Sequence, residues 1–222
     1  MLIGGIDEAG RGPVIGPLVM AIAVIKEEDE FKLKALGVKD SKLLSPKKRE
    51  EMISVLKEIC QTVVLKISPS DVDKAVLSSS DNLNWLEART AAKLISAVTC
   101  KKVILDCPST NLESYKEYIK NKLNNKLTNK DVKIIVEHKA DLNHLIVGAA
   151  SILAKVARDE EIKKIQKEIG VDFGSGYSSD PKTQVFIENN WSNPKYEKYI
   201  RKSWDTYKKR ESNAAQKSLG EF

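Results

Sequence analysis

The chain has 222 residues, a formal net charge of +6 and 41% hydrophobic residues, which fits one ordinary domain with a small appendage. No stretch approaches the roughly 20 apolar residues of a membrane span, and the N-terminus lacks the basic start and apolar region of a signal peptide. The three cysteines are odd in number and lack zinc-ligand spacing. These features argue against a membrane-spanning protein and predict a cytoplasmic one.

Basic residues are concentrated near the C-terminus. Residues 181–217 carry nine Lys or Arg against four Asp or Glu, and five aromatic residues lie among them: Trp191, Tyr196, Tyr199, Trp204 and Tyr207. A basic surface with aromatic side chains suits a nucleic acid. A solvated helix with an aromatic inner stripe would give the same pattern, so charge alone leaves both interpretations open.

Hydrophobic periodicity gives the predicted elements in chain order. Glycine and proline at 10–17 separate two runs rich in Ile and Val, which predicts strands at 3–9 and 18–25. Ser45 and Pro46 predict a helix start, because serine caps a helix and proline suits its first position. Further strands are expected at 62–67, 101–106 and 132–136, and helices at 46–59, 69–77, 82–98, 112–123, 142–169, 183–189 and 195–210. This alternation predicts an α/β domain with a mixed sheet flanked by helices.

Acidic residues stand where three of the predicted strands end. Asp7 and Glu8 follow the first apolar run, Asp106 ends another, and Asp141 comes shortly after a third. Active sites of open α/β sheets lie at strand ends, and four carboxylates gathered there need cations to stay ionised. Hard oxygen ligands favour Mg²⁺ or Mn²⁺, and two such ions suit phosphodiester cleavage. Each acid alone could simply cap a helix, so the prediction rests on their coincidence.

The turn that follows the first two acids contains Gly10, Arg11 and Gly12, and with Gly16 it resembles a dinucleotide-binding glycine loop. Its spacing differs by one residue, and prolines interrupt the helix that such a loop requires. A nucleotide cofactor is therefore not expected. A glycine turn still offers backbone groups to a ligand at close range, without a side chain in the way.

Six segments of the chain occur together in an order known from one family. They are GIDEAGRGPVIGPLV, DSKLLSPKKRE, ILDCP, HKAD, GAASILAKVARDEE and GSGYSSDP, over residues 3 to about 181, followed by RKSW. The set resembles the ribonuclease HII family, the type 2 ribonucleases H, in its archaeal form. One departure is Ser178, where archaeal relatives often carry proline. The resemblance implies an RNase H-like catalytic domain over 1–175, a helical C-terminal extension over 176–210 and a flexible tail over 211–222.

The resemblance also implies an activity. The family hydrolyses the RNA strand of RNA–DNA hybrids and nicks duplex DNA 5′ of an embedded ribonucleotide, leaving 3′-hydroxyl and 5′-phosphate ends, with two Mg²⁺ or Mn²⁺ ions. Its catalytic, metal-binding acids fall on the four strand-end acids: Asp7, Glu8, Asp106 and Asp141. Two independent arguments therefore select the same four residues.

Substrate-binding positions of the family can be carried over to this chain in the same way. The residues that hold the ribonucleotide and its neighbouring phosphate fall on Gly10, Arg11 and Gly12, the tyrosine that packs on the next sugar falls on Tyr177, and a contact near the phosphate backbone falls on Ser41 and Lys42. Lys155 and Arg158 match the long-helix motif. For these two, a structural salt bridge and a substrate contact both remain open.

The last seven residues resemble the sliding-clamp peptide Q-x-x-L-x-x-F, which replication and repair proteins use to bind PCNA. Gln216, Leu219 and Phe222 occupy its three defined positions. Leu219 and Phe222 would share one face of a short helical turn and fill an apolar pocket. The alternative is a disordered polar tail that happens to match.

Two other functions remain open from the sequence. One is a catalytically silent RNA–DNA binding module attached to the clamp, and the other is a nuclease of the same fold that cuts branched DNA. The protein is expected to be a monomer. The sequence leaves undecided the physiological metal and the preference between long hybrids and single ribonucleotides.

Overall fold

The computed structural model describes residues 1–38, 44–124 and 132–219. The chain forms two compact units. Unit 1 consists of Met1–Ala9, Val19–Lys66 and Leu83–Ala157, and unit 2 of Gly10–Leu18, Ile67–Asn82 and Arg158–Phe222. None of the helices in these described ranges is long and apolar enough to cross a membrane.

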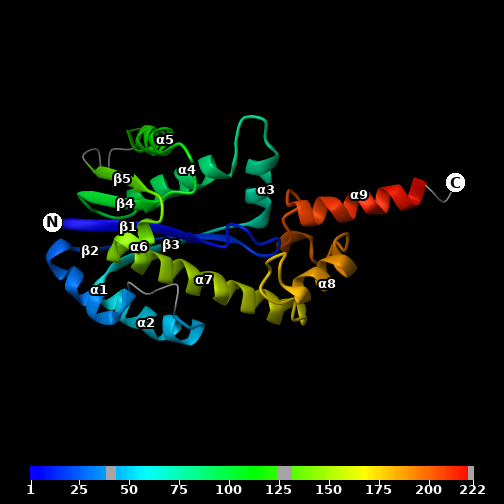
Figure 1. Ribbon diagram of the computed structural model, residues 1–222, viewed down its shortest axis with the longest axis horizontal. Helices are drawn as coiled ribbons and strands as arrows, with labels where there is room; N and C mark the ends of the chain where they lie inside the picture. Colours follow the sequence, from blue (N-terminus) through cyan, green and yellow to red (C-terminus); the bar gives the residue numbers. More distant parts are fainter. Residues whose placement is uncertain (39–43, 125–131, 220–222) are drawn as a thin grey trace. The chain divides into compact units, whose positions relative to one another are not determined.

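A five-stranded mixed sheet forms the centre of unit 1 (Figure 1). Its strands are β1 (Leu2–Ala9), β2 (Leu18–Lys26), β3 (Gln61–Ile67), β4 (Lys102–Asp106) and β5 (Lys133–Glu137), in the order β3-β2-β1-β4-β5. β1 pairs antiparallel with β2 and parallel with β4, and β4 pairs parallel with β5. The carboxyl ends of β1, β4 and β5 therefore lie at the same edge of the sheet.

Apart from α1, the helices agree closely with the sequence prediction as far as the end of α5. Their bounds are α1 (Glu30–Leu36), α2 (Pro46–Ile59), α3 (Pro69–Leu77), α4 (Leu83–Ser96), α5 (Leu112–Asn124), α6 (Ala140–Asn143), α7 (Leu145–Ile169), α8 (Pro181–Asn190) and α9 (Asp205–Leu219), with short 3₁₀ turns at Glu27–Asp29 and Glu197–Tyr199. The hydroxyl of Ser45 accepts a hydrogen bond from the Lys48 N–H at 3.2 Å, which confirms the predicted cap of α2.

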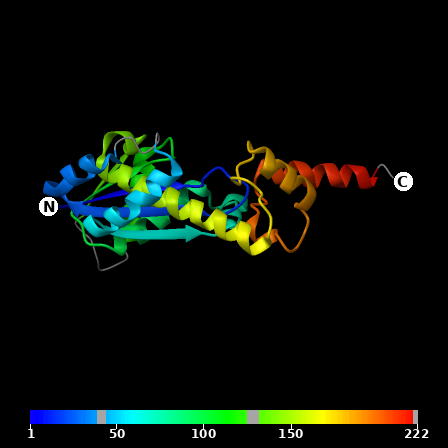
Figure 2. The same ribbon diagram turned by 90° about the horizontal axis from the view of Figure 1, so that it is seen from below.

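Helices cover both faces of the sheet in unit 1. Figure 1 shows α4 and α5 on one side of the strands and α1, α2 and the first half of α7 on the other, and Figure 2 shows that second face from the front. The start of α7 approaches β1 closely at Gly5, where an added Cβ would lie 2.4 Å from the Ile146 carbonyl carbon. Only glycine allows this approach, and it brings the middle of α7 over the end of β1.

A separate hydrophobic core holds unit 2 together. It contains Val14 and Ile15 from the turn after β1, Ile162 and Ile165 from α7, and several aromatic residues. Tyr196 and Tyr207 are buried in it, and Trp191, Tyr199 and Trp204 pack against it. The interleaved aromatic residues therefore pack in or against this core, and they come from several short segments and not from one face of a single helix.

One long helix predicted over 142–169 is divided in the structure. α6 ends at Asn143, His144 is extended with φ −126° and ψ 118°, and α7 begins at Leu145. The His144 carbonyl accepts the Val147 N–H, so His144 caps the second helix. Its ring nitrogen lies 2.9 Å from the Glu137 carboxylate, a contact that hydrophobic periodicity does not reveal.

The prediction of one helix over residues 195–210 is wrong. Ile200 is extended and bridges to Ile15, and the Arg201 N–H donates to the Val14 carbonyl at 2.8 Å. The chain then turns over residues 201–204, where the Trp204 N–H donates to the Arg201 carbonyl at 3.4 Å. α9 then starts at Asp205 and continues to Leu219, beyond the predicted end. α1 was absent from the prediction, since Leu33 is its one buried residue and gives no apolar stripe.

Candidate active site

Asp7 lies on β1 at the carboxyl edge of the sheet and is 5% exposed. Its Oδ1 accepts the Glu8 N–H at 2.8 Å, and the Ser151 hydroxyl from α7 also hydrogen-bonds to the carboxylate. Ser151 in turn accepts a hydrogen bond from the Lys155 ammonium at 2.6 Å. The Ser151 hydroxyl thus links the buried Asp7 carboxylate to the Lys155 ammonium. Lys155 therefore makes a structural contact within unit 1.

Burial raises the pKa of Asp7 from 3.8 to about 6, because the charged form loses its hydration. The hydrogen bonds from Ser151 and Glu8 lower this pKa, the Asp106 charge raises it, and the Lys155 charge lowers it. Asp7 therefore depends on its positive neighbours, or on a bound cation, to remain ionised near neutral pH.

Replacing Ser151 with alanine should raise the pKa of Asp7 above its wild-type value of about 6, because the carboxylate loses a donor and its link to Lys155. Carboxyl ¹³C NMR of the ion-free protein measures this pKa directly. Ser54→Ala is a suitable control, since the Ser54 hydroxyl bonds only locally to the Glu51 carbonyl on α2. An unchanged Asp7 titration in Ser151→Ala would contradict the assigned contact.

Asp106 and Asp141 belong to the neighbouring strand ends. Asp106 is the last residue of β4, and its Oδ1 accepts the Ala140 N–H at the start of α6, at 2.9 Å. Asp141 is the next residue in that helix and is 4% exposed. The Asp106 carboxylate thus fixes the helix that carries Asp141.

A fifth acid, Glu87, was missed by the sequence prediction. It is completely buried on α4, and burial, with smaller contributions from the charges of Asp106, Glu8 and Glu87, raises the pKa of the Cys107 thiol to about 11. These acids therefore surround the residue that follows β4. The available signal was the spacing of Glu87, four residues before Ala91 and seven before Leu94, which are buried on the same face of α4.

The donor chemistry of these acids fits a hard divalent cation, because every predicted ligand is a carboxylate oxygen and two of them, Asp7 and Asp141, are buried. Within the described ranges, however, no three His, Cys, Asp or Glu side chains are gathered closely enough to hold one ion. The predicted ligands thus lie at the carboxyl ends of neighbouring strands, but they are not arranged as a preformed metal site among the described residues.

The glycine turn and Tyr177 come together within unit 2. Gly10 has φ +80°, and an added Cβ there would lie 2.7 Å from the Pro17 carbonyl oxygen, so the turn requires glycine. At Gly12 an added Cβ would lie 3.6 Å from the Tyr177 ring. Arg158 is buried, its guanidinium stacks 5.0 Å from the centre of that ring, and it donates to the Ser175 carbonyl. Arg158 therefore supports the tyrosine loop.

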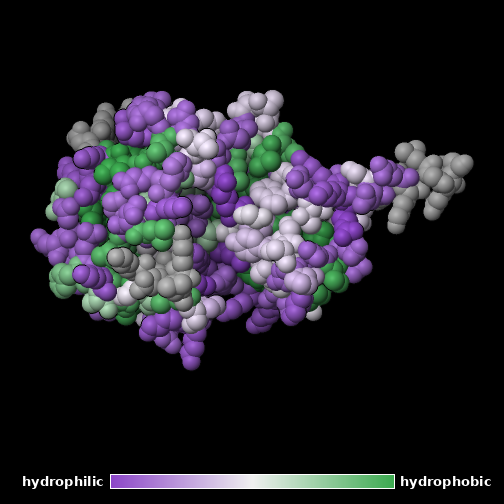
Figure 3. Space-filling view, in the orientation of Figure 1, coloured by the Kyte–Doolittle hydropathy of each residue, from purple (hydrophilic) through white to green (hydrophobic). Residues whose placement is uncertain are grey.

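The remaining predicted positions lie elsewhere. Ser41 and Lys42 fall outside the described residues. Gln216 is exposed on α9 and Leu219 ends that helix, while Phe222 falls outside the part of the chain that the structure describes. The surface over α9 is largely hydrophilic in Figure 3. The structure thus describes only part of the predicted clamp peptide.

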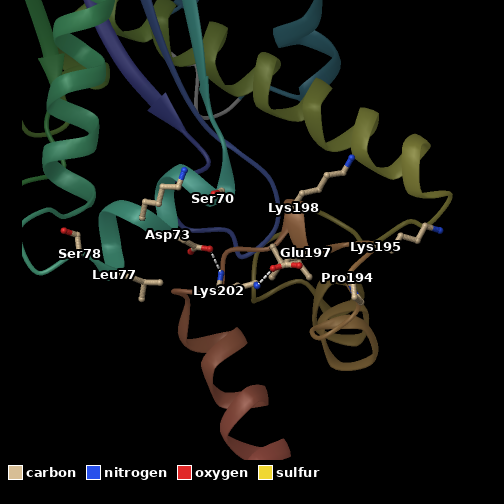
Figure 4. Close-up of a pocket in the computed structure, with 11 residues that line it drawn as sticks. Ser70, Asp73, Leu77, Ser78, Pro194, Lys195, Glu197, Lys198 and Lys202 are labelled. Atoms are coloured by element: carbon tan, nitrogen blue, oxygen red, sulfur yellow. Dashed lines mark hydrogen bonds and ion pairs between the residues drawn. The ribbon is translucent and has the colours of Figure 1, made fainter.

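An open groove in unit 2 lies beside α3 (Figure 4). Its lining includes four lysines, Lys74, Lys195, Lys198 and Lys202, together with Asp73 and Glu197. Lys202 pairs with Glu197, and Lys198 pairs with Glu168 at 2.8 Å. These ion pairs partly neutralise the excess of basic residues that the sequence shows in this segment.

Comparisons with known proteins agree with this architecture. A sequence model described as Ribonuclease HII matches residues 4–207. Ribonuclease HII of Methanococcus maripaludis is 45% identical over 93% of this chain and 86% of its own length. The fold is similar to that of ribonuclease H2 from Pyrococcus horikoshii, with a TM-score of 0.84, 38% identity, and coverage of 96% of this chain and 98% of the other.

A second solved structure, the PCNA:RNase HII complex from Archaeoglobus fulgidus, has a TM-score of 0.82 and 36% identity, covering 92% of this chain and 96% of that one. The predicted RNase H-like mixed sheet flanked by helices is confirmed by these neighbours. The match over most of the chain, at this identity, shows that the protein belongs to the ribonuclease HII family.

Proposed function

We propose that the protein is an endoribonuclease that hydrolyses the RNA strand of RNA–DNA hybrids and nicks duplex DNA 5′ of embedded ribonucleotides, leaving 3′-hydroxyl and 5′-phosphate ends. Family membership supports ribonuclease H activity in general. The observation that carries the finer proposal is the direct succession of a buried carboxylate and a glycine turn. Asp7 is separated from Gly10 by only two residues.

In this proposal the four acids Asp7, Glu8, Asp106 and Asp141 hold two divalent cations, Mg²⁺ or Mn²⁺. When bound, these ions supply activation of water and stabilisation of the leaving 3′-oxygen. The chain's own contribution is to keep Asp7 ionised through Ser151 and Lys155, and to hold α6 in place through Asp106. Removal of the divalent ions with EDTA should stop cleavage.

Recognition is assigned to the turn and to the tyrosine. The 2′-hydroxyl distinguishes RNA from DNA, and it can be read by backbone groups of Gly10, Arg11 and Gly12. The Arg11 side chain would hold the adjacent phosphate, and Tyr177, which is 38% exposed, would pack on the next sugar. Residues 1–175 would form the catalytic domain and 176–210 the helical extension of a cytoplasmic monomer.

Product mapping on a duplex with one embedded ribonucleotide, with Mg²⁺ and with Mn²⁺, tests the proposal. A single cut 5′ of the ribonucleotide with a 3′-hydroxyl end is expected. Binding without cleavage would instead indicate the silent module. Cleavage of a branched all-DNA substrate would indicate a resolvase, and under our proposal that substrate stays intact.

Replacing Arg11 with alanine should lower cleavage at a single ribonucleotide by about 10- to 100-fold, the cost of a charge-assisted hydrogen bond to phosphate. Steady-state cleavage rates measure the effect. Lys120→Ala removes one exposed charge on α5, which pairs with Glu117, and serves as the control for net charge. Equal rates in wild type and Arg11→Ala would remove the assigned role.

The proposal includes binding of the PCNA clamp by the C-terminal peptide, since a homologous structure is a PCNA complex. The double substitution Leu219→Ala and Phe222→Ala should weaken PCNA binding by about 30-fold or more, because both apolar anchors are lost. Calorimetric titration with PCNA gives the affinity. The matched control changes Lys217 and Ser218, which occupy two of the four variable positions of the motif, and should bind as wild type does.

A further inference from the structure

One fully buried arginine in unit 2 is bonded to the turn assigned to ribonucleotide recognition. Arg201 is 0% exposed. Its Nη2 donates to the Gly10 carbonyl at 2.6 Å and to the Gly16 carbonyl at 3.0 Å, and Nε also donates to Gly16 at 3.1 Å. Its Nη1 donates to the Arg11 carbonyl at 2.9 Å. A single guanidinium therefore engages both ends of the turn.

The third carbonyl of the turn is held by the same segment. The indole Nε1 of Trp204 donates to the Gly12 carbonyl at 2.8 Å, and the Arg201 guanidinium lies 4.8 Å from the centre of the Trp204 ring. All three carbonyls of Gly10, Arg11 and Gly12 thus accept hydrogen bonds from residues 201–204. With its carbonyl held, each peptide group has a fixed orientation, which also fixes the adjoining N–H groups.

The segment that provides these donors is itself anchored to α3. Asp73 accepts the Lys202 N–H at 2.8 Å and the Ser203 N–H at 2.9 Å, and it also accepts the Ser203 hydroxyl at 2.5 Å. Figure 4 shows Asp73 projecting from α3 to Lys202. Three hydrogen bonds to one carboxylate hold residues 202 and 203 in their bent conformation, and the flanking Arg201 and Trp204 both reach the glycine turn.

Burying a guanidinium costs several kcal/mol unless it is fully hydrogen-bonded. Neutral carbonyls bind it less strongly than carboxylates do, so stability alone does not explain an arginine at this position. A glycine turn is otherwise flexible, and ordering it at the moment of binding lowers affinity. Holding the turn in advance removes that cost for the ligand that matches it.

We propose that Arg201 and Trp204, anchored by Asp73, are positioning residues that set the selectivity of the turn for a ribonucleotide over a deoxyribonucleotide. This inference rests on the proposed function of the turn. When the hydrogen bonds to these carbonyls are removed, the peptide groups of the turn can rotate. The turn then distinguishes a 2′-hydroxyl from a 2′-hydrogen less well. General contacts with the phosphate backbone are retained, so binding of all-DNA duplex changes little.

The test compares two duplexes that differ by one 2′-hydroxyl. Affinities of the full-length protein for a single-ribonucleotide duplex and for the all-DNA duplex are measured by fluorescence anisotropy, with Ca²⁺ in place of Mg²⁺ to prevent cleavage. Trp204→Phe removes one donor and keeps an aromatic ring beside Arg201. It should lower the affinity ratio by about 3- to 10-fold. Arg201→Lys should lower it at least as much.

Controls separate this role from a loss of stability. Phe186→Leu weakens the core of unit 2, where the ring packs on Phe173 and Tyr196, so it should lower the melting temperature and leave the affinity ratio unchanged. Asp73→Asn removes one of the carboxylate oxygens that accept hydrogen bonds from residues 202 and 203. It should lower the affinity ratio, although Asp73 itself is not part of the glycine turn. If folded Trp204→Phe and Arg201→Lys both keep the wild-type ratio, the positioning role is wrong. A wild-type ratio near one would overturn the proposed function as well.

Discussion

Asp7→Asn is expected to reduce cleavage of a single-ribonucleotide duplex by about 10³-fold, because several kcal/mol of metal-dependent stabilisation depends on the carboxylate charge. The same substitution should make the ion-free protein more stable at pH 8. The asparagine can still accept the Glu8 N–H and can donate to the Ser151 hydroxyl, so the local hydrogen bonds are kept. Loss of activity would therefore accompany a gain in stability.

The pH dependence of that gain follows from the pKa of Asp7, which burial raises from 3.8 to about 6. Because the folded-state pKa is the higher one, the contribution of Asp7 to stability is complete below pH 3.8. It is lost as the pH rises through about 6, and ionised Asp7 then costs the fold up to about 3 kcal/mol. Asp7→Asn should therefore exceed wild type in stability at pH 8 and match it near pH 4.

Urea unfolding at the two pH values, with and without Mg²⁺, measures these differences. Mg²⁺ should stabilise wild type at pH 8 more than it stabilises Asp7→Asn, because an ion that binds only the folded protein adds stability. Glu28→Gln, on an exposed acid in the 3₁₀ turn before α1, is the control for a simple loss of charge. If the difference in unfolding free energy between wild type and Asp7→Asn is the same at pH 4 and at pH 8, the raised pKa assigned to Asp7 is wrong.

Gly5→Ala should lower the free energy of unfolding by about 3 kcal/mol or more, because overpacking against a rigid backbone is costly. The added methyl would lie 2.4 Å from the Ile146 carbonyl carbon and 2.5 Å from the Val147 nitrogen. α7 must move away from β1 to make room. That movement would also draw Ser151 and Lys155 away from Asp7, so activity should fall in the protein that still folds.

Gly4→Ala is the matched control for this substitution. Its added methyl would meet the Val103 side chain at 3.2 Å, and a side-chain methyl can shift where a backbone carbonyl does not. We expect a loss of stability of about 1 kcal/mol or less and near-normal cleavage. Thermal unfolding of both variants gives the comparison. Equal losses would show that α7 does not depend on Gly5 for its approach to the sheet.

Local signals in the sequence predicted much of the fold. Ser45 with Pro46 marked a helix start, because the capping hydroxyl and the helix it caps are neighbours in the chain. The ends of apolar runs located the strand ends. They also located the acids of the sheet edge, since a strand end is a local feature.

The sequence was less informative where a distant contact decides the backbone. Hydrophobic periodicity favoured continuous helices at His144 and at Ile200. At Ile200 and Arg201, pairing with Ile15 and a hydrogen bond from the Arg201 N–H to the Val14 carbonyl replace the bonds that a helix would have made. At His144 the backbone hydrogen bonds stay local, and the distant contact is that of its ring with Glu137.

The sequence by itself predicted the four acids and the glycine turn as a site, and it indicated the family to which the protein belongs. Only the tertiary structure decided how these parts are held: Ser151 and Lys155 behind Asp7, and Arg201, 191 residues from Gly10, behind the turn. The reason is physical. Every residue has a backbone carbonyl, so the sequence does not show which carbonyl will accept a hydrogen bond from a distant side chain. That pairing is decided only when the fold brings donor and acceptor together.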